Sequence, residues 1–370
     1  MPKVIIAGGG IAGLASATAL ERAGWAVSIH ERASDIRLLG AALSLWPNAT
    51  AALDRLGLLE QVTAVGAPLN AMFVGDQAGK PIMAARRMTS PALMVTRAAL
   101  QHCLASAVKS PVVLDDAIEA VDQHDDCVKV RFADGRTETT DLLIDAGGVW
   151  SPISSTVIDG RADYRGYGGV IALSDRVDGK LDGVASEYWG RHERFGLFEI
   201  TDNRRYWFFM QTQEANAIPL THAEVSKKSK AWPRGIAEAV DATPPERLIP
   251  FSIHAKPPPK RLGSGRIICV GDAAHAMEPN LGQGACQAIE DAAALTMLAS
   301  SNAPEALLPA FEKLRLKRVR NIVGRAAEAR SGAHGSPLMQ SMMRTLLRTL
   351  PQSFIDRISR DVQTMPDYRP

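Results

Sequence analysis

The chain has 370 residues, of which 46% are hydrophobic and 22% are charged. This balance is typical of a globular protein long enough for two or three domains, and it excludes a disordered chain or one dominated by membrane spans. The 42 basic and 40 acidic residues leave a net charge of +2, so the composition gives no reason to expect a nucleic-acid partner.

The first part of the chain predicts a βαβ unit followed by a hairpin. An apolar run at 4–7 indicates a strand, 12–23 a helix and 26–30 a second, parallel strand. Further on, 127–132 and 136–140 are strand-like and flank an Asp-Gly pair. Because Asp-Gly favours positive φ, these two runs are predicted to form a β-hairpin.

The turn of the βαβ unit predicts a dinucleotide site. Its sequence GGGIAG satisfies GxGxxG directly after a strand and at the start of a helix. We expect Gly8 to make the tight turn, Gly10 to let the backbone approach a pyrophosphate, and Gly13 to allow close packing of helix on strand. Glu31 ends the second strand, where a carboxylate accepts hydrogen bonds from a ribose diol. The motif leaves open whether the ligand is NAD or FAD, and the alternative is a turn that binds nothing.

The pattern of apolar and polar residues changes twice in the rest of the chain. A buried strand is expected at 142–144, and short strand-like runs then alternate with polar turns over 165–255, which is typical of an antiparallel sheet. A buried strand at 267–270 and a helix at 283–299 return to the first type of pattern, and long helices follow Pro304.

These elements predict an α/β fold. We expect a Rossmann-like domain at 1–164 with small inserted segments, an inserted antiparallel β-sheet substrate domain at 165–260, a return segment of the first domain at 261–302, and C-terminal helices at 303–370.

The cysteines and the N-terminus favour the cytoplasm. The apolar run at 4–7 is too short for a secretory signal core, and no run of about 18 apolar residues follows. The four cysteines form no CxxC pair and no metal-ligand spacing, so no metal is expected and the thiols are interpreted as reduced and structural. They are Cys103, Cys127, Cys269 and Cys286.

A second motif carries a family resemblance. Residues 266–284 read RIICVGDAAHAMEPNLGQG, a strand, a Gly-Asp pair and a turn at a helix start, and residues 40–48 read GAALSLWPN. Together with the glycine turn, they resemble the single-component FAD-dependent aromatic hydroxylases, the group A flavoprotein monooxygenases of the salicylate, para-hydroxybenzoate, urate and alkylquinolone type. The resemblance covers essentially the whole chain and favours FAD as the bound dinucleotide.

The resemblance implies a set of FAD contacts. Asp272 is expected to hydrogen-bond the ribityl chain, and the turn from Pro279 to Gly284 to lie against the flavin ring, where N–H groups of the helix start would stabilise negative charge. Arg97 matches an arginine beside the cofactor; the alternative is a solvated charge at a helix start. His275 is assigned a structural hydrogen bond, not catalysis. The residues assigned to the cofactor are Gly8, Gly10, Ile11, Ala12, Gly13, Glu31, Arg32, Ala42, Arg97, Asp272, Pro279, Gly282, Gln283 and Gly284.

One family motif is altered in this chain. Most relatives carry Ala-Asp-Gly-x-x-Ser-x-x-Arg where this chain has AGGVWSPIS at 146–154, so that Gly147 replaces the aspartate and Ser154 the arginine. Because that motif is associated with FAD and with NAD(P)H, the change bears on the reduction step. Asp145 lies two residues earlier on the same side of an extended strand, and we hypothesise that it compensates in part.

The substrate face is expected on a hairpin whose turn centres on Asp202. Strand alternation would then place the even-numbered residues of 194–200 and 204–210 on one face. An arginine and a tyrosine with this separation occur in urate- and quinolone-hydroxylating relatives, which implies catalytic roles for Arg194 and Tyr206. The alternative is ordinary sheet packing with a surface arginine. Substrate contacts are assigned to Phe198, Phe208 and Met210, and Gly196 is expected on the same face.

The resemblance implies a reaction as well. NADH or NADPH would reduce FAD, O2 would form a flavin C4a-hydroperoxide, and an aromatic or N-heteroaromatic small molecule would be hydroxylated. The alternatives are a flavin oxidase or reductase on the same scaffold, and a non-catalytic FAD-binding protein. We expect a monomer or homodimer without integral membrane association. The apolar C-terminal helix around Met339–Leu350 would touch a membrane surface or an apolar substrate, or else pack in the core or a dimer.

Overall fold

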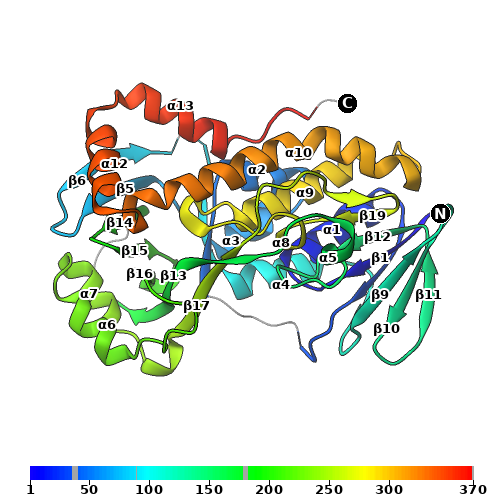
Figure 1. Ribbon diagram of the computed structural model, residues 1–370, viewed down its shortest axis with the longest axis horizontal. Coiled ribbons are helices and arrows are strands. Elements are labelled where there is room, and N and C mark those ends of the chain that lie inside the picture. The colour runs from blue at the N-terminus through cyan, green and yellow to red at the C-terminus, as the bar shows by residue number, and fades with distance from the viewer. Residues whose placement is uncertain (36–40, 89, 178–181, 369–370) are drawn as a thin grey trace.

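The computed structural model describes residues 1–35, 41–88, 90–177 and 182–368, and Figure 1 shows two large sheets with helices packed around them. The first sheet has the order β18-β19-β12-β1-β2-β8, parallel except between β18 and β19. Its strands are β1 (Lys3–Ala7), β2 (Ala26–His30), β8 (Val112–Val113), β12 (Leu142–Asp145), β18 (Gly263–Ser264) and β19 (Ile267–Cys269). The predicted βαβ unit is confirmed, with α1 (Ile11–Arg22) joining β1 to β2.

Alternating side chains of β1 bury the two faces of this sheet against different partners. Val4 and Ile6 belong to the main core with α1, whereas Ile5 and Ala7 pack with Phe132 and its neighbours in a three-stranded sheet. That sheet consists of β9 (Ile118–Gln123), β10 (Val128–Phe132) and β11 (Thr137–Thr140). The hairpin predicted from the Asp-Gly pair is therefore present, and it covers one face of the parallel sheet.

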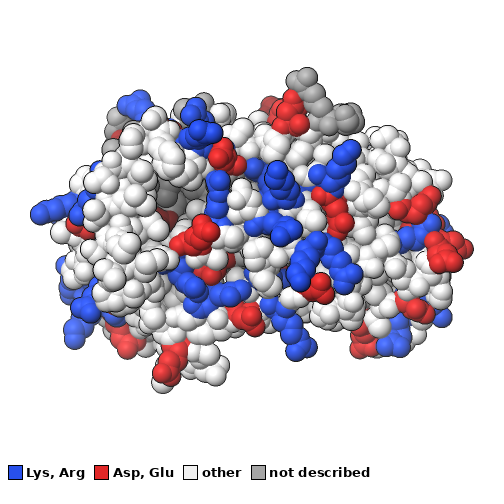
Figure 2. Space-filling model, turned by 45° about the horizontal axis from the view of Figure 1, so that its top comes forward, with Lys and Arg blue, Asp and Glu red and all other residues white. Residues whose placement is uncertain are grey.

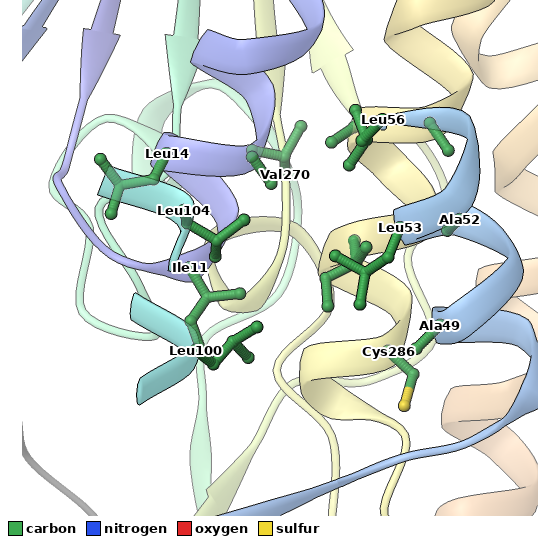
Figure 3. Close-up of a cluster of buried hydrophobic side chains, with 14 of the residues drawn as sticks. Ile11, Leu14, Ala49, Ala52, Leu53, Leu56, Leu100, Leu104, Val270 and Cys286 are labelled. Atoms are coloured by element: carbon green, nitrogen blue, oxygen red, sulfur yellow. The ribbon is translucent and has the colours of Figure 1, made fainter. Parts of the chain in front are cut away.

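The main core lies where four helices meet (Figure 3). Side chains of α1, α2 (Pro47–Arg55), α4 (Arg97–Ala107) and α9 (Gly284–Leu298) point toward one another there, with Leu14, Leu53 and Leu104 among them. Small residues let the helices approach: Ala15 and Ala19 of α1 and Ala292 of α9 are completely buried. The alanine-rich helix α9 therefore comes close to the glycine turn that precedes α1.

The second sheet has seven strands in the order β17-β13-β16-β15-β14-β5-β6. They are β5 (Ala71–Asp76), β6 (Pro81–Arg87), β13 (Asp163–Arg176), β14 (Val184–Trp189), β15 (Glu193–Glu199), β16 (Arg204–Thr212) and β17 (Ile249–Ala255). The expected antiparallel sheet is thus larger than 165–260 supplies. Two strands come from the N-terminal part of the chain, and one of them, β5, pairs in parallel with β14.

The hairpin β15–β16 has the register that the sequence predicted. Asp202 lies in the turn with φ of 63°, and Arg194 pairs with Met210, as Phe198 does with Tyr206. The even-numbered residues therefore share one face. Residues of the other face, Phe195 and Trp207 among them, pack against α6 (His222–Ser229) and α7 (Arg234–Asp241).

Smaller elements connect these sheets. A three-stranded sheet contains β3, β7 and β4, and the long helix α10 runs across the upper part of Figure 1 above both large sheets. None of the helices in the part of the chain that is described has the length and apolar character needed to cross a bilayer. The remaining elements are β3 (Ala42–Leu45), α3 (Leu59–Val65), β4 (Ala67–Pro68), β7 (Leu93–Thr96), α5 (Ser154–Val157), η1 (Thr201–Asn203), η2 (Pro245–Arg247), α8 (Asp272–His275), η3 (Pro279–Leu281), α10 (Pro304–Ala329), α11 (Ser331–His334), α12 (Pro337–Thr349) and α13 (Gln352–Gln363).

Candidate functional site

A cavity of about 1270 Å³ is lined by residues of both large sheets and of the helices between them. A pocket for one small molecule occupies roughly 300–1,000 Å³, so this cavity has room for more than one ligand. Most of the residues assigned to the site from the sequence line it. They are Gly8, Gly10, Ile11, Ala12, Glu31, Arg32, Ala42, Arg97, Phe198, Tyr206, Phe208, Met210, Asp272, Pro279, Gly282 and Gly284.

The glycine turn has the geometry that a dinucleotide requires. Gly8 has φ of +113°, and a Cβ at Gly13 would lie 1.9 Å from the carbonyl oxygen of Gly8, so helix and strand touch there through backbone. Gly13 accordingly supports the turn and does not line the cavity. At Gly10 an ideal Cβ meets no protein heavy atom within 4 Å. The backbone N–H groups at the start of α1 are therefore open to a phosphate.

Glu31 closes the turn from the other side. One oxygen of its carboxylate accepts a hydrogen bond from the Gly9 N–H at 2.7 Å, and the other accepts from the Ala33 N–H at 2.9 Å. Each carboxylate oxygen retains a further lone pair, so the group can still accept a ribose hydroxyl. Arg32, next to it, is exposed on the cavity wall.

The segment from Asp272 to Gly284 reaches the same cavity from the far end of the sequence. Asp272, Pro279, Gly282 and Gly284 line it, and α9 begins at Gly284. The positive end of the helix dipole of α9 therefore lies on the cavity wall. Gln283 is the exception: its side chain is buried and accepts a hydrogen bond from the Asn48 amide at 2.9 Å, so it holds α9 against α2.

Unpartnered donors on the cavity wall test whether a flavin dinucleotide fits. The Nε atoms of Trp46 and Arg97 are buried without a hydrogen-bond partner among the described residues, and both side chains line the cavity. Buried donors are nearly always paired in native proteins, so this wall suits an acceptor-rich ligand. The burial of the Arg97 Nε also disfavours the alternative in which Arg97 is only a solvated charge at a helix start. Ala42 of β3 lines the same wall, whereas Gly40, in the stretch that resembled the family, lies outside the described residues.

The altered family motif has its own hydrogen bonds. Asp145 is buried at the end of β12 and lines the cavity, but its carboxylate accepts from the Ser151 hydroxyl at 2.7 and 2.8 Å and from the Gly147 N–H at 3.0 Å. Burial raises the pKa of Asp145 despite these bonds. Beside it, the buried Lys256 ammonium donates to the Ser154 hydroxyl at 3.0 Å. A lysine from another segment thus contacts the serine that replaces the family's arginine.

His275 has a structural hydrogen bond, as the sequence-based interpretation expected. Its Nε2 lies 2.7 Å from a carboxylate oxygen of Asp291, and both side chains are only 1% exposed. The other oxygen of Asp291 accepts from the Arg315 Nε at 2.8 Å. His275 does not line the cavity.

The hairpin β15–β16 supplies an aromatic wall. The rings of Phe198, Tyr206 and Phe208 have centroids 5.6 to 6.4 Å apart, and Met210 completes the surface. Arg194 is different. Its guanidinium lies 5.2 Å from the Phe208 ring centroid and 2% of the residue is exposed, so it is buried at this wall without lining the cavity.

Tyr206 and Arg194 lie in an environment of opposed charges. The guanidinium of Arg194 lies 3.6 Å from the carboxylate of Glu187 on β14. Burial and Glu187 hold the pKa of Tyr206 well above its ordinary value, while Arg194 lowers it. The phenol is therefore protonated at neutral pH and can donate a hydrogen bond into the cavity.

Sequence reasoning missed part of the cavity wall. Glu187 and Trp189 of β14 line it, as do residues of β5, β6 and α13. Residues of α12 line it as well, and contact with an apolar substrate is one of the alternatives that the sequence left open for this helix. The sequence does carry signals for these strands. Polar and apolar residues alternate in VASEYW at 184–189, and Gly79 indicates a turn between 71–76 and 81–87. Nothing in those local patterns indicates that the strands join the aromatic hairpin.

The fold and the site together define a flavin-dependent oxidoreductase: a glycine turn, the Glu31 carboxylate and a helix start converge on one cavity that ends in an aromatic wall. The chain belongs to the family described as FAD binding domain, whose model matches residues 1–326. It has the group A flavoprotein monooxygenase fold, and the relatives that it matches are FAD-dependent monooxygenases of the hydroxylase type.

Named relatives and solved structures agree with this membership. The chain is 33% identical over 331 residues to an aurachin C monooxygenase/isomerase of Stigmatella aurantiaca, covering 86% of each chain. It is 27% identical over 386 residues to an FAD-dependent urate hydroxylase of Klebsiella oxytoca, covering 98% and 99%. A crystal structure of Klebsiella pneumoniae HpxO complexed with FAD and uric acid superimposes with a TM-score of 0.89 at 26% identity, covering 98% of this chain and 96% of the other.

Proposed function

We propose that the protein hydroxylates an aromatic or N-heteroaromatic small molecule with electrons from NADH or NADPH and oxygen from O2. The observation that carries the proposal is the continuity of the cavity from Gly10 to Phe198, Tyr206 and Phe208. A flavin ring lying between these ends would face an apolar aromatic wall from which water is displaced. The similarity to relatives that act on urate and on aurachin C supports a heteroaromatic substrate.

Bound FAD would supply the redox and oxygen chemistry, and the residues of the chain would bind, orient and shield. The Tyr206 phenol would donate a hydrogen bond to an oxygen of the substrate ring, while the charge of Arg194 stabilises an anionic form of that ring from behind Phe208. The start of α9 at Gly284 would stabilise negative charge on the reduced flavin.

A flavin oxidase or reductase is the second candidate. The observation that favours it is the replacement at Gly147 and Ser154, because the relatives use that motif around the flavin and the nicotinamide. A non-catalytic FAD-binding protein would instead leave its flavin inert toward both NADH and NADPH.

One experiment separates these candidates. The purified protein is mixed with NADH or NADPH and with phenols, quinolones or purines, and the consumption of cofactor and the product mass are followed under isotope-labelled O2. A hydroxylase incorporates one labelled oxygen into the product. An oxidase consumes the nicotinamide and releases peroxide with every compound tested, which would contradict the proposal.

We also propose that the protein works in the cytoplasm as a monomer or homodimer. The free cysteines support a reducing compartment, and three of them, Cys103, Cys269 and Cys286, are buried. Analytical ultracentrifugation of the flavin-loaded protein tests the assembly, and a higher oligomer would contradict it.

A further inference from the structure

The cavity continues past the aromatic wall toward the edge of the seven-stranded sheet. Strand register places Phe208, Gly196, Glu187, Val74 and Met83 in one row from β16 to β6, and all but Gly196 line the cavity. Directly paired residues share a face of a sheet. Four steps between neighbouring strands, each about 4.8 Å, give this floor a length of roughly 19 Å.

The chemistry of the floor changes along this row. The hairpin end carries the rings of Phe198, Tyr206 and Phe208, whereas the β5–β6 end carries Met72, Val74 and Met83. Flexible thioether side chains fit irregular aliphatic groups better than they stack on a flat ring.

Two C-terminal helices cover the β5–β6 end. Helix α12 packs against β6, and its residues at i and i+4 face the cavity, as do residues of α13 at i, i+3 and i+7. These side chains are Met343, Leu347, Leu350, Ile355, Ile358 and Val362. With Met72, Val74 and Met83 they enclose what we call the tail compartment. Figure 2 shows uncharged surface on the side where α12 lies, with a hollow next to it.

The arginines that reach this part of the wall are paired. The Nε of Arg86 lies 3.1 Å from a carboxylate oxygen of Asp356, and the guanidinium of Arg325 lies 3.7 Å from that of Asp361. Both carboxylates belong to α13, so these arginines hold the helix over the cavity and offer no free positive charge for an anionic substrate group.

We propose that the substrate is an aromatic ring that carries an aliphatic chain of several carbons, with the ring against Phe198 and Phe208 and the chain in the tail compartment. The inference rests on the proposed function for the position of the ring. A small polar substrate would leave the apolar side chains of the compartment against water, whereas an aliphatic chain buries them and gains binding free energy with each methylene.

Dissociation constants for two homologous series test the proposal. The probes are phenols and 4-hydroxyquinolines that carry n-alkyl chains from none to nonyl, and binding is followed by the change in the flavin absorption spectrum without NAD(P)H. We expect the dissociation constant to fall about fourfold per methylene, until the compartment is filled, and to level off beyond that length.

Adjacent leucines of α12 provide a matched pair of variants. Leu347 lines the tail compartment, whereas Leu346 is 49% exposed and does not line the cavity. Leu347→Trp should shorten the chain length at which affinity stops rising, and Leu346→Trp should keep the wild-type profile. Met83→Trp, on β6, is a second variant that should also shorten the optimum if Leu347→Trp does not fold.

Two results would overturn the inference: dissociation constants that do not depend on chain length in either series, including no binding at any length, or equal effects of Leu346→Trp and Leu347→Trp. Failure of the proposed function gives a different outcome. In that case the affinity still rises with chain length, but no hydroxylated product forms with NAD(P)H and O2.

Discussion

At the scale of single residues, Gly10 and Gly13 need glycine for different reasons. The backbone of Gly10 is extended, with φ of −79° and ψ of −172°, a conformation that β-branched residues adopt readily. A Cβ at Gly10 would meet no protein heavy atom within 4 Å. Its absence therefore leaves room for a ligand and not for another part of the chain. At Gly13, in contrast, a Cβ would collide with the Gly8 carbonyl oxygen. The absence of a side chain at Gly10 leaves space on the cavity wall, whereas at Gly13 it lets helix and strand pack.

Gly10→Val should therefore fold but lose its flavin. Gly10 precedes the first residue of α1, where this change costs on the order of 1 kcal/mol. A hydrogen bond to a charged group is worth roughly 1.5–3 kcal/mol, so displacing even one phosphate contact weakens FAD binding at least about tenfold. Flavin absorbance per protein and the melting temperature of the flavin-free protein are measured. Gly324→Val in α10, where a Cβ also meets nothing within 4 Å, is the control. Retained flavin in Gly10→Val would refute the pyrophosphate assignment.

Tyr206→Phe tests whether the phenol acts on the substrate. Because its pKa is raised, the hydroxyl stays protonated and donates a hydrogen bond at neutral pH. Losing a hydrogen bond to a charged oxygen should lower kcat for hydroxylation by about 10- to 100-fold, with little effect on FAD content. Tyr188→Phe is the matched control, since Tyr188 packs against Phe73 and does not line the cavity. Equal kcat values for Tyr206→Phe and Tyr188→Phe would remove Tyr206 from the mechanism.

At the scale of elements, local patterns predicted what local geometry determines. The βαβ unit and the β15–β16 register follow from the glycine turn and from Asp202, because turns and strand alternation are short-range properties. The parallel pairing of β5 with β14 joins residues more than 100 positions apart, and no local pattern specifies such a partner. The β5–β6 side of the tail compartment was missed for this reason.

The same distinction holds within the site. Alternation predicted that Arg194 and Tyr206 share a face of the sheet. It could not predict how deeply each side chain is buried, and Arg194 in fact lies buried behind Phe208. Spacing predicted a turn at Pro279–Gly284, yet the Gln283 side chain turns toward Asn48 and away from the cavity. Depth and side-chain direction depend on the packing of distant elements, in these cases β14 and α2.

The packing of α9 against α10 depends on a buried arginine. Arg315 of α10 is completely buried and donates hydrogen bonds to Glu290 at 2.6 Å and to Asp291 at 2.8 Å. Removing one partner of a buried ion pair costs about 3–5 kcal/mol, and Arg315→Met should lower the free energy of unfolding by that amount. Arg234→Met is the control, because Arg234 is 92% exposed in its pair with Glu238 and should change stability by less than about 0.5 kcal/mol. Denaturant titration measures both, and equal stability losses would contradict the assigned role.

At the scale of the whole molecule, the same charges join distant parts of the chain. Glu290 accepts hydrogen bonds from Asn48 of α2, from Arg315 and Arg318 of α10, and from the hydroxyl of Tyr368 near the C-terminus. Asp291 adds His275 and the Gly271 N–H, at the turn that leads to Asp272. The turn before Asp272 on the cavity wall and the C-terminal segment are thus held by one buried network. The free energy of unfolding should therefore depend on the protonation of Glu290 and Asp291.

This network should make the effect of Arg315→Met depend on pH. Burial raises the pKa values of Glu290 and Asp291, but Arg315, together with Arg318 at Glu290 and His275 at Asp291, holds both below their ordinary range. A lowered pKa in the folded state contributes stability above the unfolded value of about 4, and that contribution is lost as the pH falls toward the folded pKa. The difference in unfolding free energy between wild type and Arg315→Met should therefore be largest near neutral pH and shrink below about pH 4. Urea titrations across this range measure it, with Arg234→Met as the variant whose small difference should stay flat. A wild-type advantage over Arg315→Met that is constant from neutral to acid pH would show that the buried carboxylates do not depend on Arg315 for their charge.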